Sequence, residues 1–315
     1  MMMVKGIVGG DEFFTEVIIR GLTLNAAADG YYFGNFNENV GKRIENKYGV
    51  HFVKNIDDFV GNSALLFLTF EPADTEKLLS RLAGKINSET LIISVVPTLN
   101  LKKLEETFPN NEIIRLFITP SIISGQGLGA YVVSKNASIS AQSVAEIILQ
   151  DCGDVINVEN EAELEKISDF LVANTYVSYV TIQSMLRNAK KLKLSEVEAN
   201  FIVSKLFGGS VHTLIETGKD TAAMIRRGTL DQRFRTRVTK LIETQGIKAD
   251  LEKFIERPVY AEIIEAEEEE KIAQGSSGNR FSNVTDAATA KKSKTDSAEI
   301  KKPKLQMHYK GDEKN

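Results

Sequence analysis

The chain has 315 residues, 42% of them hydrophobic, and a net charge of −4, so it has room for two domains and no general attraction to nucleic acid. Its single cysteine, Cys152, excludes an internal disulfide, a thiolate metal cluster and a two-cysteine redox motif. No stretch has the apolar length of a membrane helix and the first residues lack a secretory pattern, so we expect a cytoplasmic protein that does not bind membranes.

Short apolar runs alternate with helix-like segments from residue 4 to about residue 150. The strand candidates, most of them too apolar for a strand with one face in water, are VKGIVGG (4–10), GYYFGN (30–35), ALLFLTF (64–70), TLIISVV (90–96), EIIRLFI (112–118) and AYVVS (130–134). The segments between them that predict amphipathic helices are EFFTEVIIRGL (12–22), DTEKLLSRLAGKI (74–86) and LKKLEETF (101–108). This alternation predicts a Rossmann-like, doubly wound, mostly parallel sheet over residues 1–152.

The pattern changes after residue 152. From Val155 to Phe207 there is neither glycine nor proline, and apolar residues recur at helical spacing, which predicts an all-helical domain over residues 153–257. Residues 258–315 carry an acidic run and then many lysines, with few large apolar side chains to offset the cost of ordering. We expect a charged, disordered tail there, which either only adds solubility or contacts an acidic surface.

The first strand candidate ends at a glycine turn, KGIVGGDEFF. Dinucleotide-binding turns use three spaced glycines. Here Gly9 stands at the first place, Asp11 at the second and Phe14 at the third. A carboxylate about 5 Å from a phosphate charge is repelled by roughly 3 kcal/mol at an effective dielectric constant near 20. Two interpretations stay open: Asp11 caps its own helix, or a displaced turn uses Gly9 and Gly10 to hold a nucleotide.

The residues at the ends of two further strands also indicate whether the chain can bind a dinucleotide. Asn35 follows the second strand where an acidic residue would report on a ribose, and Lys42 and Arg43 come one helical turn later, which favours NADP over NAD if a dinucleotide binds. The alternative is that these two cations only solvate a helix face. In TFEP (69–72), Glu71 either adds negative charge to the same cleft or caps the next helix. The residues that we expect to contact the cofactor are Gly9, Gly10, Asn35, Phe70 and Pro72.

Later segments resemble the pyrroline-5-carboxylate reductase family. IIRLFITPSIISGQGLGAYVVS (113–134) is similar to a family segment with an arginine, an Asn-Thr-Pro turn and a Gly-x-Gly, and Arg115, Gly125 and Gly127 keep the spacing. The nearest match to the Asn-Thr-Pro turn is altered, at Thr119, Pro120 and Ser121. The segments 198–227 and 241–247 are similar to family patterns in the helical domain. The resemblance covers residues 4–255 and implies an NAD(P)H-dependent oxidoreductase that reduces a small cyclic imine in proline biosynthesis, as a homodimer or an assembly of dimers.

The substrate motif of that family is missing. Its Ser-Pro-Gly-Gly-Thr-Thr stretch falls on Leu230, Asp231, Gln232, Arg233, Phe234 and Arg235, none of which matches, so no catalytic residue is carried over. No histidine has the spacing of a metal site either. A group of arginines, Arg226, Arg227, Arg233, Arg235 and Arg237, favours an anionic ligand, or else forms an exposed helix face.

Two hypotheses about function remain. The first is a divergent reductase acting on a small-molecule substrate with NADP. The second is a non-catalytic relative that serves as a ligand-sensing or scaffold dimer. The loss of motifs argues for weak or absent activity.

Overall fold

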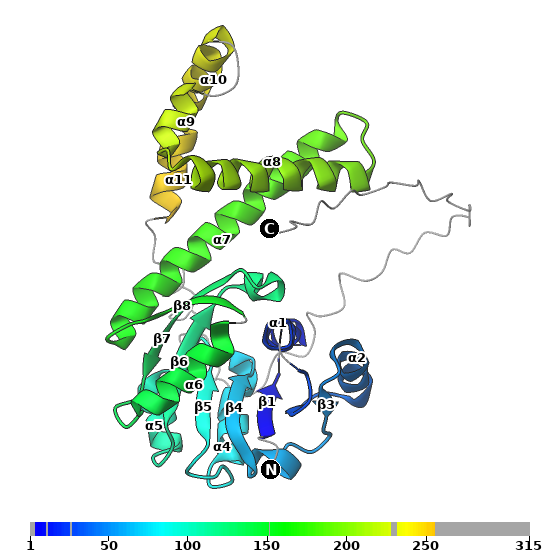
Figure 1. Ribbon diagram of the computed structural model, residues 1–315, viewed down its shortest axis with the longest axis vertical. Helices are drawn as coiled ribbons and strands as arrows, with labels where there is room; N and C mark the ends of the chain where they lie inside the picture. The colour runs from blue at the N-terminus through cyan, green and yellow to red at the C-terminus, as the bar shows by residue number, and fades with distance from the viewer. Residues whose placement is uncertain (1–3, 11, 26, 151, 228–231, 256–315) are drawn as a thin grey trace, which may run out of the picture. The chain divides into compact units, whose positions relative to one another are not determined.

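The computed structural model describes residues 4–10, 12–25, 27–150, 152–227 and 232–255. In this part of the chain, eight strands form one sheet in the order β3-β2-β1-β4-β5-β6-β7-β8 (Figure 1). The strands are β1 (Val4–Gly9), β2 (Tyr31–Gly34), β3 (His51–Phe52), β4 (Ser63–Thr69), β5 (Leu91–Ser94), β6 (Ile113–Ile118), β7 (Gly127–Val133) and β8 (Gly153–Asn157). Neighbouring strands pair in parallel, except that β6 and β7 are antiparallel. The predicted mostly parallel sheet is confirmed.

Helices cover both faces of this sheet, as β4 shows residue by residue. Leu65 and Phe67 belong to one hydrophobic core and Leu66 and Leu68 to another, because successive side chains of a strand point to opposite faces. All four are almost fully buried, so the strand has no polar alternation. Burying each such side chain contributes about 1.5–3 kcal/mol.

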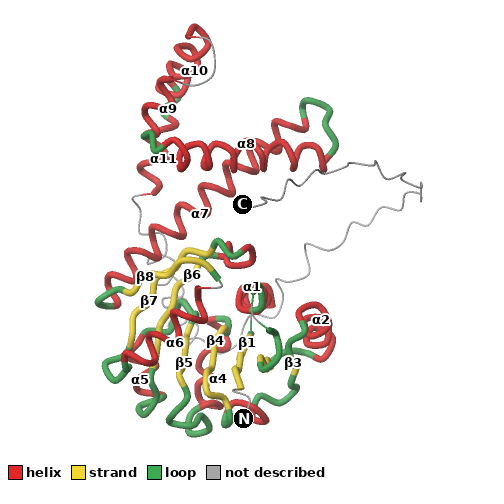
Figure 2. The backbone as a smooth tube through the Cα atoms, viewed as in Figure 1, coloured by secondary structure: helices red, strands yellow, loops and turns green. Residues whose placement is uncertain are grey.

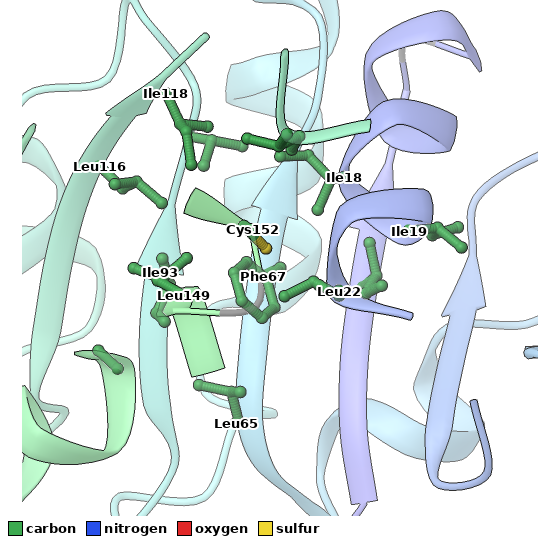
Figure 3. Packing of buried hydrophobic residues seen from close by; sticks show 14 of the residues in the cluster. Ile18, Ile19, Leu22, Leu65, Phe67, Ile93, Leu116, Ile118, Leu149 and Cys152 are labelled. Carbon is green, nitrogen blue, oxygen red and sulfur yellow. The ribbon is translucent and has the colours of Figure 1, made fainter. Parts of the chain in front are cut away.

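The helices divide between the two cores. The helices of the sheet domain are α1 (Glu12–Leu22), α2 (Glu38–Tyr48), α3 (Asp57–Val60), α4 (Thr75–Leu82), α5 (Leu101–Thr107) and α6 (Ile139–Gln150), with short 3-10 helices η1 (Pro72–Asp74) and η2 (Pro120–Ser124). Helices α1, α2 and α6 supply the first core, and α3, α4 and α5 supply the second. Figure 3 shows part of the first core, where Leu22, Phe67 and Leu149 lie around Cys152.

The segments after the sheet are helical. They are α7 (Glu161–Lys190), α8 (Glu196–Thr217), α9 (Thr221–Arg227), α10 (Gln232–Thr244) and α11 (Ile247–Ile255), and Figure 2 shows them as a succession of helices without a strand. Asn160 caps the start of α7, and Ser195 and Glu198 form a capping box at the start of α8. Gly218 ends α8 with φ of 58°, a conformation that favours glycine. No helix in the described residues has the length and apolar character needed to cross a membrane.

The last strand lies beyond residue 152, the boundary expected from the sequence. Strand β8 pairs in parallel with β7, so the sheet continues to Asn157, and helix begins only at Glu161. The absence of glycine and proline from this stretch does not distinguish a strand from a helix. A side chain at Gly153 would overlap the backbone of Gly127, so β8 can begin against β7 only with glycine. The expected tail, residues 258–315, lies outside the described residues.

Candidate active site

The turn after β1 lies at the carboxyl edge of the sheet, between β2 and β4. A side chain at Gly9 would overlap the ring of Phe36 and come within 2.7 Å of Thr15 Oγ1. One at Gly10 would lie 3.0 Å from the backbone nitrogen of Glu71. A Cβ at Gly9 would overlap its neighbours, whereas a Cβ at Gly10 would make a tight contact that a small shift of the neighbours relieves, so the need for glycine is stronger at Gly9. Asp11, the residue on which the charge argument depends, lies outside the described residues, so its effect on a phosphate stays a prediction.

Asn35 joins the loop after β2 to this turn. Its side-chain amide donates to the carbonyl oxygen of Gly9 across 2.6 Å. Its φ is 75°, a left-handed conformation that asparagine tolerates better than most residues. The structure thus brings together Gly9 and Asn35, two residues chosen from separate strand ends in the sequence.

The loop after β4 closes the other side of the turn. Phe70 is buried, and its Cα lies 3.2 Å from where a side chain at Gly10 would begin. Pro72 starts η1 directly afterwards. Glu71 is exposed, and its carbonyl oxygen, rather than its carboxylate, accepts from the Asp74 nitrogen and Thr75 Oγ1 at 3.1 Å each. One possibility from the sequence was that the Glu71 carboxylate caps this helix. The structure does not show that contact, and the N-cap of α4 is Asp74.

Two hydroxyl groups that the sequence analysis did not single out fix α1 on the sheet. Thr15 Oγ1 and Thr69 Oγ1 are 2.8 Å apart and buried, and Thr69 also donates to the carbonyl oxygen of Val8. A small hydroxyl residue directly after Phe14 allows the helix to approach the strand, although the third glycine of the usual turn is absent. A threonine in the first turn of a predicted helix is the only sequence signal for this contact.

Two basic residues of helix α2, Arg43 and Lys47, contact α1. Arg43 Nη2 donates to Glu12 Oε1 at 2.5 Å and to Glu16 Oε2 at 2.9 Å. Lys47 and Tyr48 donate to the other Glu16 oxygen at 2.6 and 2.7 Å. Burial raises the pKa of Glu16, but the hydrogen bonds from Lys47, Tyr48 and Arg43 outweigh it and lower the pKa from 4.5 to about 2. Arg43 therefore does more than solvate a helix face, since it links two helices.

These ion pairs determine how much charge is left around the turn for a bound dinucleotide. Lys42 pairs with Glu38 on its own helix at 2.6 Å, and Arg43 offsets the charge of Glu12 in the first turn of α1. The close-packed glycines, the neutral Asn35 and the start of α1 are compatible with a dinucleotide-binding turn. The carboxylate of Glu71, at the same edge of the sheet, forms no ion pair with any side chain that the structure describes.

A cavity of about 440 Å³ adjoins the turn, and we call it the aromatic cavity. Its walls are Phe13 and Phe14 of α1, Val95 and Pro97 after β5, Phe117, Ile118, Thr119 and Pro120 at the end of β6, and Val172, Thr175, Tyr176 and Tyr179 of α7. None of these lining residues is charged, and the polar side-chain groups are hydroxyls. Thr119 uses its hydroxyl within the fold, bonding Ser121 Oγ at 2.8 Å and accepting from the Leu128 nitrogen.

Arg115 holds two walls of the aromatic cavity together. Its side chain is 7% exposed and donates to Glu161 Oε1 of α7 at 2.7 Å and to the Pro97 carbonyl at 2.9 Å. The same Glu161 oxygen accepts from the Leu101 nitrogen at 2.7 Å. The arginine noted for its spacing thus joins β6 to α7 and to the loop after β5.

The other candidate residues are less fully described. Leu230 and Asp231 lie outside the described residues. The side chains of Arg226, Arg227, Phe234 and Arg235 are not described either. Arg233 and Arg237 are exposed on α10, and the anion site remains a prediction. Among the described residues, no three His, Cys, Asp or Glu side chains are grouped to hold a metal ion.

Comparison with known proteins supports the resemblance derived from the sequence. No family model matches the chain. Pyrroline-5-carboxylate reductase 1 of Bacillus spizizenii is 22% identical over 177 residues, which are 56% of this chain and 59% of the Bacillus protein. The match thus spans about three fifths of the relative's length.

Solved structures show the likeness in fold over more of the chain. The Plasmodium falciparum pyrroline carboxylate reductase, solved with NADP bound, has a TM-score of 0.71 at 15% identity and covers 84% of this chain and 98% of its own. The pyrroline-5-carboxylate reductase of Coxiella burnetii has a TM-score of 0.67 with the same identity and coverage. The chain therefore has the fold of these reductases and resembles them distantly in sequence.

Proposed function

We propose that this chain, which shares its fold with the pyrroline-5-carboxylate reductases, is a cytoplasmic, NADPH-dependent reductase that acts on the C=N bond of a small cyclic imine, of the proline-biosynthesis type. The observation that carries the proposal is that the glycine turn and the aromatic cavity are adjacent, because α1 begins at the turn and supplies Phe13 and Phe14 to the cavity wall. The nucleotide contacts would come from Gly9, Gly10, Asn35, Phe70 and Pro72.

The chain's contribution to the reaction is positioning and the exclusion of water. A bound nicotinamide supplies the hydride, as it does in oxidoreductases generally. Rings and aliphatic side chains line the aromatic cavity, so a substrate seated there is held in a low-dielectric site from which water is displaced. Thr175 is one of the lining residues, and a threonine hydroxyl can donate a hydrogen bond to a ring nitrogen. Hydride addition to the carbon requires one proton on the ring nitrogen, which solvent water at the exposed rim beside Phe13 would supply, while the described side chains orient the substrate.

The preference for NADP over NAD rests on the residues after β2. Asn35 and Asn37 are neutral, and Arg43 lies within reach of the start of α1 through its contact with Glu12. A 2′-phosphate would compete with Glu12 and Glu16 for the Arg43 guanidinium, since all three offer oxygen acceptors to the same donor. The Plasmodium structure that shares the fold was solved with NADP bound, which supports the same choice.

We also propose that two copies pair through their helical parts. Large apolar side chains that do not line the aromatic cavity are exposed along two helices: Phe170 and Val180 on α7, and Phe201, Leu206, Val211 and Ile215 on α8. Exposed apolar surface of this extent is typical of an interface. Sedimentation of the full chain should give twice the mass of one copy, and a monomer at micromolar concentration would contradict the pairing.

A second candidate is a non-catalytic relative that binds a ligand or acts as a scaffold dimer. The exposed Glu71 beside Gly10 favours it, because the carboxylate adds negative charge where the pyrophosphate would lie. The residues aligned with the family's substrate motif, 230–235, offer no pair of hydroxyls. This alternative predicts that neither NADPH nor NADH stabilises the protein.

Thermal unfolding with each nucleotide separates the two candidates. A ligand at 100 times its Kd stabilises the folded state by about 2.7 kcal/mol, so saturating NADPH should raise the Tm clearly, and more than NADH does. Consumption of NADPH with pyrroline-5-carboxylate then tests the reaction itself. An unchanged Tm with both nucleotides would overturn the reductase proposal and favour the non-catalytic one.

A further inference from the structure

The positions at which the sequence departs from the reductase pattern come together in space. Phe14 stands at the third glycine place of the turn, and Thr119 and Pro120 stand in the altered Asn-Thr-Pro turn. They are about a hundred residues apart in the chain, yet all of them line the aromatic cavity. These departures therefore reshape one site together.

The resulting lining has a definite chemistry. Five aromatic rings line the cavity, from Phe13, Phe14, Phe117, Tyr176 and Tyr179, and none of the lining residues that the structure describes is charged. A carboxylate bound there would lose its hydration without gaining a cation, which is strongly unfavourable. Arg115 supports the walls, but its guanidinium is buried and bonded to Glu161 and to the Pro97 carbonyl.

The hydroxyls of Thr175, Tyr176 and Tyr179 remain for neutral polar atoms of a ligand. Among the described residues, none forms a hydrogen bond with the side chain of Thr175, which is half-buried in the cavity wall. A hydroxyl in an otherwise apolar pocket fixes the orientation of a ligand through a single nitrogen or oxygen. The volume of about 440 Å³ lies within the range of about 300–1,000 Å³ found for small-molecule sites.

We propose that the aromatic cavity binds a neutral, ring-bearing imine with an apolar substituent, in preference to a cyclic imine that carries a carboxylate. This inference deepens the proposed function and rests on it for the C=N group, while the choice of a neutral, apolar ligand rests on the cavity alone. Val95, Ile118 and Thr119 form a buried wall, being 4%, 4% and 7% exposed, whereas Phe13, Tyr176 and Tyr179 are 69%, 62% and 53% exposed, so the cavity opens to solvent beside α1 and α7.

Calorimetric titration of the full chain tests this with two matched cyclic imines at mildly alkaline pH. The probes are 2-phenyl-1-pyrroline, which is uncharged there, and pyrroline-5-carboxylate, which is anionic. We expect the phenyl compound to bind at least ten times more tightly. Thr175→Asp should weaken its binding at least tenfold, because it adds a charge to the wall, whereas Thr175→Val should weaken it only a fewfold through loss of one hydrogen bond.

Two further variants make the test specific. Phe13 is 69% exposed at the cavity rim, so Phe13→Ala should weaken binding of the phenyl compound with little effect on folding. Thr236→Asp adds the same charge at an exposed site on α10 that does not line the cavity, and should leave binding unchanged. Circular dichroism of each variant confirms that it is folded.

The outcomes separate this inference from the proposed function. Equal or tighter binding of pyrroline-5-carboxylate would overturn the inference, as would an undiminished affinity of Thr175→Asp for the phenyl compound. If the phenyl compound does not bind and Thr175→Asp instead dissociates a dimer, a second copy fills the cavity and the inference also fails. Tight binding of the phenyl compound without any binding of NADPH would uphold the inference and overturn the reductase.

Discussion

The side-chain amide of Asn35 donates to the carbonyl oxygen of Gly9 across 2.6 Å, and so ties the loop after β2 to the turn after β1. The contact requires Asn35 to hold φ at 75°, where a residue with a Cβ and no local hydrogen bond is strained. The geometry of the expected nucleotide edge thus depends on one amide.

Comparing Asn35→Ala with Asn35→Gly separates the contribution of the hydrogen bond from the strain of the left-handed backbone conformation. Both variants lose a hydrogen bond that contributes about 1 kcal/mol, and alanine adds about 1–2 kcal/mol of left-handed strain that glycine avoids. We therefore expect urea unfolding to show a larger loss for alanine than for glycine. Equal losses would mean that the backbone conformation costs nothing, contrary to this explanation.

Glu16 should make stability depend on acid. Its pKa is lowered to about 2 in the folded protein, against 4.5 as its ordinary value. A depressed pKa contributes stability that is complete above about pH 4.5 and is lost as the pH falls toward about 2. We expect Glu16→Gln to lower the free energy of unfolding by about 1–2 kcal/mol near neutrality, since its partners are exposed, and to flatten the acid limb of the curve.

Glu38 is the control for this measurement. It forms a fully exposed pair with Lys42, and that hydrogen bond lowers the pKa of Glu38. Solvent screens such a pair, so Glu38→Gln should change stability less than Glu16→Gln does. A larger effect at Glu38 would show that burial does not determine the strength of these contacts.

Replacing only one member of the Arg115–Glu161 ion pair should strongly lower the free energy of unfolding. Arg115→Leu leaves the Glu161 carboxylate without its buried partner and should destabilise the fold by about 3–5 kcal/mol. Adding Glu161→Leu removes the uncompensated charge and should restore part of the loss, as a double-mutant cycle would show. Additive losses would mean that the two side chains act independently.

Asp11→Gly tests the charge argument made from the sequence. If the carboxylate at the second place of the turn repels the pyrophosphate, removing it should tighten NADPH binding about tenfold or more, as calorimetry would measure. Glu106→Gln, at an exposed site on α5, is the comparison and should leave the affinity for NADPH unchanged. An unchanged affinity for Asp11→Gly would mean that the nucleotide lies away from this residue or does not bind at all.

The sequence predicts most of the sheet because six strands are apolar runs that end at turn-forming residues. It does not predict β3, which has two residues, or β8, where DVIN has no apolar run long enough to stand out. At the site, Gly9, Gly10 and Asn35 follow from their positions at strand ends.

The aromatic cavity does not follow from the sequence, and the reason is physical. Its walls come from four segments between Phe13 and Tyr179, and nothing local shows that they meet. Phe117 and Val172 are typical of a core, and only the packing of α7 on β7 reveals which of them face an opening. The pairing of Arg43 with α1 depends in the same way on the distance between two helices.

The antiparallel junction between β6 and β7 has a consequence for how the protein opens. Strand β8 pairs with β7 alone at the end of the sheet order, and Ala130, Val132, Val158 and Leu164 pack α7 onto this pair. Strand β8 is therefore an edge strand that pairs on one side only, whereas β1 pairs with β2 and β4 on its two sides. Amide hydrogens of β7 and β8 should exchange with solvent before those of β1 and β4. The part of the site beside α7 should therefore become accessible to solvent faster than the glycine turn after β1.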